Sequence, residues 1–311
     1  DVGSNSIKAL VAAIGSGPFS LEVIHEATRN VRLSKGISGN PPMLQADRMD
    51  AGIEAVRELA EDCRRNGPLE ALEIVATSAV RTALNGHRFT EAVEEVTGVR
   101  PVVLTGGEEA DAIAIGVRTD PLIEDSLTDF TVFDLGGGSL ELIRFEHHGV
   151  TDRASLPLGS VRLTEAFVAD PSRPFPRSVQ RSIRDHLRRS IRATGFALSA
   201  PLVGCSGGLA ALRSAFARQD GSGFANAGPH LPASRLLELG ERVLGQDLGE
   251  RVRISGLPPE RADIFPTAFL TFQVLLELSG ADGILHSLHN LRYGRAWVLL
   301  HPVPEVKGPT D

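Results

Sequence analysis

Three consecutive glycines, residues 136–138, stand between two acidic residues of this chain, Asp134 and Glu141. Glycine lets the backbone approach a ligand closely, so consecutive amide groups could converge on a phosphate oxygen, with the Ser139 hydroxyl as a further donor. The two carboxylates suit a hard cation such as Mg²⁺, and without a cation they would repel a phosphate. The alternative is a tight hairpin, for which one or two glycines would be enough. We expect a metal-assisted phosphate site.

This glycine segment differs from the better-known phosphate loops. It lacks the Lys-Ser/Thr pair of a Walker loop. The residues after the glycines alternate as a strand does, with Leu140 and Leu142 inward and Glu141 outward, whereas a dinucleotide fold opens a helix at this point. The pattern therefore predicts a phosphate cradle in a hairpin.

A strand-to-helix turn at Thr105 supplies a candidate base. Thr105 and Glu108 have the spacing of a capping box, which gives Glu108 a structural role and leaves Glu109 unassigned. Glu109 could compensate the helix macrodipole, or it could be a general base that deprotonates a water for attack on phosphorus. The spacing alone does not decide between these two roles.

Arg81 lies in the first turn of a helix that the sequence predicts to start after Thr77. A cation in this place opposes the helix dipole, so we expect an anion to compensate it. That anion is either a phosphate, bound by the helix amides and by Arg81, or a carboxylate in an ion pair.

Gly207 lies in another strand-to-helix turn, residues 204–208. This turn could bring the backbone close to a phosphate or nucleotide, or it could simply permit tight packing.

A repeated pattern places two similar turns in two similar units. Residues 1–7 and 134–140 share the pattern Asp-x-Gly-x-x-Ser followed by an apolar residue. The alternation of elements in each half is that of an α/β unit. In the first unit we expect strands over 6–14, 20–26, 30–33, 72–76 and 99–104, and helices over 44–65, 79–84, 88–97 and 107–117. In the second we expect strands over 130–134, 140–145, 150–157, 201–205 and 284–287, and helices over 164–168, 177–195, 208–218, 233–245, 259–279 and 293–300.

Two such units imply a duplicated fold in which equivalent turns face one another across a cleft, and such a cleft is a default ligand site. We place the domains at residues 1–118 and 119–311, with a linker over 118–128. The second domain carries helical insertions, and the last helix could pack back on the first domain.

The composition excludes several classes of protein. The chain has 311 residues and a net charge of −7, which argues against a nucleic-acid or membrane-surface binder. Its two cysteines have no metal-ligand spacing, and we expect a reducing cytoplasm. No stretch is long and apolar enough for a membrane span. Because the chain opens at Asp1 without methionine, a targeting segment could precede it, and earlier residues should supply the first strand of the sheet.

Seven short motifs follow one another along nearly the whole chain, at residues 1–6, 76–81 with Asn85, 107–110, 134–141, 158–165, 204–207 and 256–263. In this order they resemble the exopolyphosphatase and guanosine-pentaphosphate phosphohydrolase family, within the actin, hexokinase and heat-shock ATPase superfamily. The resemblance implies two duplicated ribonuclease-H-like (actin-like ATPase) domains with an interdomain cleft.

The resemblance also implies an activity, in which water hydrolyses a phosphoanhydride. Orthophosphate would leave the end of inorganic polyphosphate or the 5′ end of guanosine pentaphosphate, with Mg²⁺ as cofactor. These roles fall on catalytic Glu109 and Arg81, on metal-binding Asp134, Glu141 and Asp1, and on phosphate-binding Ser4, Asn5, Ser6, Gly136, Gly137, Gly138, Ser139 and Gly207.

The chain departs from its relatives at Gly208, where they often have threonine, and in its length, which resembles the short two-domain members. Two further hypotheses stay open. A sensor could bind the same phosphates without useful catalysis, and a kinase-type protein could transfer phosphate from ATP, although no sugar-binding pattern is evident. A homodimer also stays open.

Overall fold

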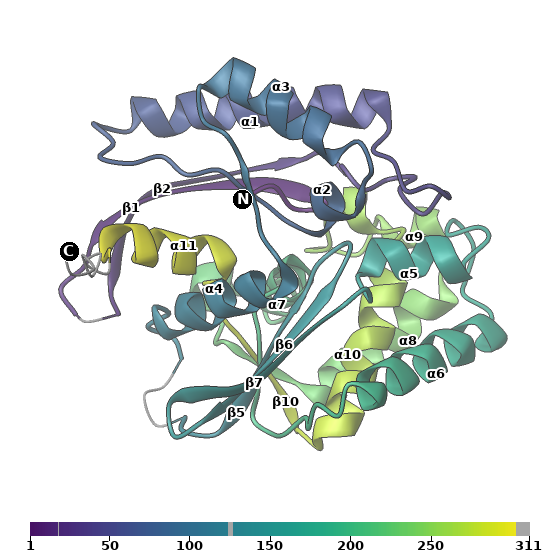
Figure 1. Cartoon of the computed structure of the whole chain (residues 1–311). Coiled ribbons are helices and arrows are strands. Elements are labelled where there is room, and N and C mark those ends of the chain that lie inside the picture. The colour runs from purple at the N-terminus through teal and green to yellow at the C-terminus, as the bar shows by residue number, and fades with distance from the viewer. Residues whose placement is uncertain (18, 124–126, 303–311) are drawn as a thin grey trace.

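The computed structural model describes residues 1–17, 19–123 and 127–302 of the chain. Figure 1 shows a group of strands near the N-terminus and a second, larger group below it, with helices between the two groups and on their outer sides. The predicted α/β class is confirmed by this arrangement. No helix of the described ranges is long and apolar enough to cross a membrane.

The N-terminal strands form two pairs that Val2 joins. Strands β1 (Ser6–Ile14) and β2 (Leu21–Asn30) are antiparallel, and β3 (Val75–Ala76) and β4 (Val102–Val103) are parallel. Val2 bridges to Ile7 on one side and to Ala76 on the other. The helices of this region are α1 (Ala46–Arg65), α2 (Ser78–Thr82), α3 (Gly86–Thr97) and α4 (Gly106–Arg118).

The second group is one six-stranded sheet in the order β7-β6-β5-β8-β10-β9. Its strands are β5 (Phe130–Leu135), β6 (Leu140–Glu146), β7 (Gly149–Leu156), β8 (Leu202–Gly204), β9 (His230–Pro232) and β10 (Gly283–His286). Its helices are α5 (Ser160–Phe167), α6 (Arg177–Ala193), α7 (Gly207–Gln219), α8 (Ala233–Gly245), α9 (Leu248–Arg251), α10 (Phe265–Ser279) and α11 (Leu291–Leu300), with 3₁₀ turns at Phe224–Asn226 and Pro259–Arg261.

Strand β5 has apolar side chains on both faces, and helices cover both of them. Phe133 packs in one core with α6, α8 and α10. Val132 points the other way, into a core with Ile113 of α4 and Leu291 of α11. Helix α4 thus lies against the larger sheet, although it follows β4 in the chain.

The last helix, α11, also contacts the N-terminal strands. Arg292 donates to Glu26 of β2 at 2.5 Å, and the Tyr293 hydroxyl donates to the same carboxylate at 2.7 Å. Arg295 forms an ion pair with Glu73. The domain boundary at residue 118 stays a prediction, and part of the predicted linker lies outside the described residues.

The short strand expected over 30–33 is wrong. Strand β2 already ends at Asn30, and the amides of Val31 and Arg32 both donate to the Asn5 carbonyl, at 3.1 and 2.8 Å. The backbone of this segment therefore holds the first repeated turn instead of pairing in a sheet.

Candidate active site

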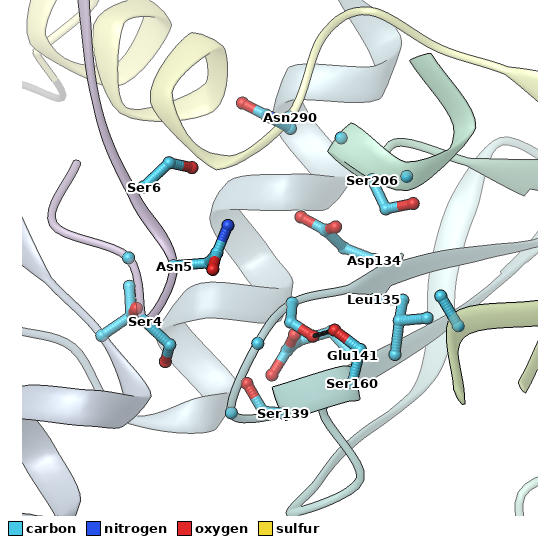
Figure 2. Close-up of a pocket in the computed structure, with 18 of the residues that line it drawn as sticks. Ser4, Asn5, Ser6, Asp134, Leu135, Ser139, Glu141, Ser160, Ser206 and Asn290 are labelled. Atoms are coloured by element: carbon cyan, nitrogen blue, oxygen red, sulfur yellow. Dashed lines mark hydrogen bonds between the residues drawn. The ribbon is translucent and has the colours of Figure 1, made fainter. Parts of the chain in front are cut away.

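The two repeated turns lie in contact with one another. A Cβ atom built on Gly137 would lie 3.1 Å from Cβ of Ser4, and one built on Gly138 would lie 2.7 Å from the Ser4 hydroxyl oxygen. Residues 1–6 and 134–139 thus form two walls of one pocket, of about 120 Å³. Figure 2 shows Ser4, Asn5 and Ser6 on one side of it, with Asp134, Glu141 and Ser139 across from them.

Almost every site residue expected from the sequence lines this pocket. Those that do are Asp1, Ser4, Asn5, Ser6, Glu109, Asp134, Gly136, Gly137, Gly138, Ser139, Glu141 and Gly207. Arg81 is not among the lining residues, but it contacts Glu109, which is.

The carbonyl groups of the glycine turn accept hydrogen bonds from helix α5, whereas the amides of Gly137 and Gly138 are available to a ligand. The carbonyl of Gly136 accepts from the Ser160 amide at 3.0 Å, and that of Gly137 accepts from the Val161 amide at 3.0 Å. Both donors belong to the first turn of α5. Within the described ranges, the amides of Gly137 and Gly138 have no acceptor. Helix α5 therefore fixes the turn through its carbonyl groups, while the amides of Gly137 and Gly138 stay unpaired in the described ranges.

The first turn is fixed in the same way. The carbonyl of Ser4 accepts from the Ser34 amide at 2.9 Å, and residues 31 and 32 donate to Asn5. The Asn5 side chain is 8 % exposed, and neither its oxygen nor its nitrogen has a partner in the described part of the chain. A buried amide without partners costs free energy, so this side chain is placed for a ligand or water.

Helix α4 positions Glu109 through the predicted capping box. The Glu108 amide donates to the Thr105 hydroxyl at 3.2 Å, and the Thr105 amide donates to the Glu108 carboxylate at 2.7 Å. The Glu108 carboxylate therefore belongs to the helix cap. The next residue, Glu109, lines the pocket with only 4 % of its surface exposed.

Arg81 forms an ion pair with Glu109, and it also donates to the Leu104 carbonyl at 2.5 Å. Of the two anions considered for Arg81, the structure shows the carboxylate. The expected place of Arg81 in a first turn is wrong, because α2 has only five residues and Arg81 lies in its last turn. The pair connects α2 to the first turn of α4, so each charge partly offsets the burial of the other.

Three carboxyl groups share the pocket: those of Glu109 and Glu141 are buried, and that of Asp134 is partly buried. Burial raises the pKa of each. Burial and then the nearby charges of Glu109 and Asp134 raise the pKa of Glu141 to about 8, although the Ser155 hydroxyl donates to it at 2.9 Å. For Glu109, the Arg81 guanidinium opposes the effect of burial on the pKa but does not reverse it.

This donor set fits Mg²⁺. Asp134 and Glu141 are direct cross-strand partners on β5 and β6, and a cation between them would relieve their repulsion. Among the described residues, no three His, Cys, Asp or Glu side chains are arranged to hold a metal by themselves. Mg²⁺ is usually held by one or two carboxylates together with waters and substrate phosphates, which two ligands satisfy. A role for Asp1, which lines the same pocket, stays a prediction.

Several lining residues were missed from the sequence. Lys8, Arg261 and Asn290 line the pocket from three distant segments. Arg261 lies inside one of the recognised motifs, which was a usable signal, and Lys8 is one of only three lysines. Asn290 gave no signal, because only the packing of the last helix brings it here.

Comparisons with known proteins identify the family of the chain. A family model described as the Ppx/GppA phosphatase family matches residues 10–299. Exopolyphosphatase 2 of Mycobacterium tuberculosis is 30 % identical, over 95 % of this chain and 96 % of that protein.

Solved structures share the fold. An exopolyphosphatase from Cytophaga hutchinsonii superposes with a TM-score of 0.84 at 20 % identity, covering 97 % of this chain and 96 % of the other. An Aquifex aeolicus member of the Ppx/GppA family superposes with a TM-score of 0.76 at 24 % identity, covering 97 % of both chains. The fold and the family expected from the motifs are thus confirmed, and the chain belongs to the Ppx/GppA phosphatase family.

Proposed function

We propose that this protein is a Mg²⁺-dependent phosphohydrolase that releases the terminal orthophosphate of inorganic polyphosphate, with Glu109 as the general base. One observation carries the proposal. Two turns, one with the unpaired amides of Gly137 and Gly138 and one with the unpartnered side chain of Asn5, meet around a pocket that also holds the carboxyl groups of Glu109, Asp134 and Glu141. Amides bind phosphate oxygens and carboxylates bind a cation, so the pocket combines both requirements of phosphoryl transfer.

Each group has a distinct task in this proposal. The amides of Gly137 and Gly138 and the hydroxyls of Ser4 and Ser139 bind the oxygens of the terminal phosphate. Asp134 and Glu141 hold Mg²⁺, which, when bound, neutralises charge on the phosphoryl group.

Glu109 orients a water and accepts its proton. Its raised pKa makes it a better proton acceptor than an exposed carboxylate. Arg81 holds the Glu109 carboxylate in place and keeps it ionised despite burial, which a base at neutral pH requires.

Guanosine pentaphosphate is the second candidate substrate. Beyond the phosphate turns, the pocket is lined by apolar side chains of Ile264, Phe265, Ala268 and Phe272. Such a wall can cover a nucleoside, which inorganic polyphosphate lacks.

A paired assay tests the proposal. Purified protein is incubated with polyphosphate and, separately, with guanosine pentaphosphate, with and without Mg²⁺, and orthophosphate is measured. We expect release from polyphosphate that chelation of Mg²⁺ abolishes. Faster release from the nucleotide would favour the second substrate. Tight calorimetric binding without release from either substrate would replace the enzyme with a sensor.

The variant Glu109→Gln tests the base. We expect turnover to fall by about two orders of magnitude or more, because glutamine cannot accept the proton. Glu108→Gln is the matched control, since it changes the neighbouring residue and glutamine still completes a capping box. A Glu109→Gln protein with near-normal turnover would remove the role assigned to Glu109.

A further inference from the structure

A serine of β7, Ser155, makes a hydrogen bond to one of the carboxyl groups of the pocket. Its hydroxyl donates to the Oε1 atom of Glu141 at 2.9 Å. Ser155 is not among the lining residues, and neither the sequence motifs nor the proposed chemistry assigns it a role. Glu141 is only 3 % exposed, so the orientation of its carboxylate depends on hydrogen bonds from protein groups such as this one.

The sheet places the two side chains next to each other. Glu141 of β6 and Ser155 of β7 are direct partners in the antiparallel pair of these strands. On its other side, Glu141 is the direct partner of Asp134 of β5. Direct partners have Cβ atoms about 4.5–5.5 Å apart, which lets a short serine side chain reach a glutamate carboxylate. Asp134, Glu141 and Ser155 therefore form one row across three strands.

Helix α4 restricts the Ser155 side chain. A Cβ atom built on Gly106, the first residue of α4, would lie 2.5 Å from Cβ of Ser155 and 2.6 Å from its hydroxyl oxygen. Two residues earlier on β7, Arg153 forms an ion pair with Asp111 of α4 at 2.6 Å. Ser155 thus lies between the strand that carries Glu141 and the helix that carries Glu109.

The hydrogen bond gives the two oxygens of the Glu141 carboxylate different surroundings. Ser155 donates to Oε1, while Glu141 itself lines the pocket opposite the first turn. Hydrogen bonds of this kind orient a carboxylate that binds a metal, and their loss typically lowers metal affinity about 10–100-fold. A hydroxyl donor also favours the ionised carboxylate, which is the form that binds a cation.

We propose that Ser155 is a positioning residue for the metal site, whose hydroxyl holds the Glu141 carboxylate in the orientation that binds Mg²⁺. The inference rests on the proposed function, in which Glu141 holds Mg²⁺. It assigns Ser155 an effect on metal affinity and none on the chemical step, because in the described part of the chain its hydroxyl is bonded to Glu141 and not to Glu109.

The test measures Mg²⁺ binding to the full chain by calorimetry. In Ser155→Ala we expect the Kd for Mg²⁺ to rise about tenfold or more, as for the loss of an outer hydrogen bond to a metal ligand. Ser155→Thr should retain most of the affinity, because it keeps the hydroxyl. The matched control is Thr151→Ala, which removes a hydroxyl from an exposed position of the same strand and should leave the Kd unchanged.

The Mg²⁺ dependence of phosphate release separates positioning from a general structural defect. We expect Ser155→Ala to need about tenfold more Mg²⁺ for half-maximal turnover and to approach the turnover of the unmodified protein at saturating Mg²⁺. Thermal unfolding shows whether the variant is folded. If Ser155→Ala does not fold, Ser155→Cys, which has nearly the same shape and a weaker donor, takes its place.

The inference is wrong if the folded variant binds Mg²⁺ as tightly as the unmodified protein, or if saturating Mg²⁺ does not restore its turnover. Ser155-dependent Mg²⁺ binding in a protein that releases no phosphate would refute the proposed function and keep the inference. Mg²⁺-dependent phosphate release with an unchanged Kd in Ser155→Ala would do the reverse. An unmodified protein that binds no Mg²⁺ would overturn both.

Discussion

At the scale of single residues, the pocket brings together three carboxyl groups, of which Glu109 and Glu141 are buried and Asp134 is partly buried. Burial disfavours their charged forms, and Arg81 relieves only Glu109. Such an arrangement destabilises the protein without metal and is typical of sites that need shifted pKa values for function. A cation between Asp134 and Glu141 would displace the Glu141 proton and stabilise both carboxylates in their ionised form.

The raised pKa of Glu141 predicts a pH dependence of stability. In the folded protein this carboxyl keeps its proton up to about pH 8, whereas its ordinary pKa is 4.5. Between these values the folded state binds more protons than the unfolded state, so stability falls as the pH rises.

Glu141→Gln removes this proton linkage while keeping the side-chain shape. In urea unfolding with Mg²⁺ chelated, we expect the variant to lose less stability than the unmodified protein between about pH 5 and pH 8, by on the order of 2–4 kcal/mol. Parallel stability profiles for the two proteins would show that Glu141 is not protonated in the fold.

At the scale of elements, the sequence patterns located most helices and the two chemical turns. The repeated Asp-x-Gly pattern predicted two facing turns, and both line one pocket. The capping-box spacing at Thr105 separated Glu108 from Glu109 correctly. These features are local, so residue type and spacing determine them.

The failures at this scale depend on contacts between distant segments. Residues 30–33 have strand-like composition, but their amides bind Asn5. The short elements β9 and α9 were not predicted, because three or four residues carry no periodicity. Lys8, Arg261 and Asn290 became site residues only because three segments converge on the pocket.

Gly159, which precedes α5, tests how the glycine turn is held. A Cβ atom there would overlap the Gly137 carbonyl group and the Gly138 nitrogen, which are backbone atoms that cannot move aside locally. We expect Gly159→Ala to destabilise the protein by about 1–3 kcal/mol and to displace the turn.

Phosphate release by Gly159→Ala should therefore fall about tenfold or more, mainly through KM. Gly245→Ala in α8 is the matched control, because a Cβ atom there meets nothing within 4 Å. If Gly159→Ala and Gly245→Ala had the same effect on phosphate release, the position of the glycine turn would not determine activity.

At the scale of the whole molecule, polar contacts cross between the N-terminal region and the larger sheet beside the pocket. Arg32 forms an ion pair with Asp263 at 2.5 Å, while its own amide donates to Asn5 of the first turn. Glu165 of α5 accepts from the Gly36 amide at 2.9 Å and from the Ser38 hydroxyl at 2.5 Å. The loop after β2 thus joins the first turn to both sides of the pocket.

The Arg32–Asp263 pair joins the loop after β2 to the segment before α10, so its loss should lower the affinity for substrate. We expect Arg32→Gln and Asp263→Asn each to raise the KM for triphosphate about threefold, and the double variant to be no worse than the more affected single one. The coupling energy would be about 0.5–1 kcal/mol, as for a partly exposed pair.

A surface ion pair provides the control for this double-mutant cycle. Arg100 and Glu94 form an ion pair at 2.7 Å with both side chains more exposed, and Arg100→Gln should leave KM unchanged. Additive effects of the Arg32 and Asp263 variants would show that the contact between these two side chains does not contribute to substrate affinity.

The central claim is that the two repeated turns bind one metal-bound oligophosphate between them. A crystal structure of the Glu109→Gln protein with Mg²⁺ and inorganic triphosphate tests it most directly. We predict a terminal phosphate within hydrogen-bond distance of the Gly137 and Gly138 amides and of the Ser4–Ser6 turn, with Mg²⁺ on Asp134 and Glu141. Triphosphate bound outside this pocket, or touching only one of the two turns, would contradict the account.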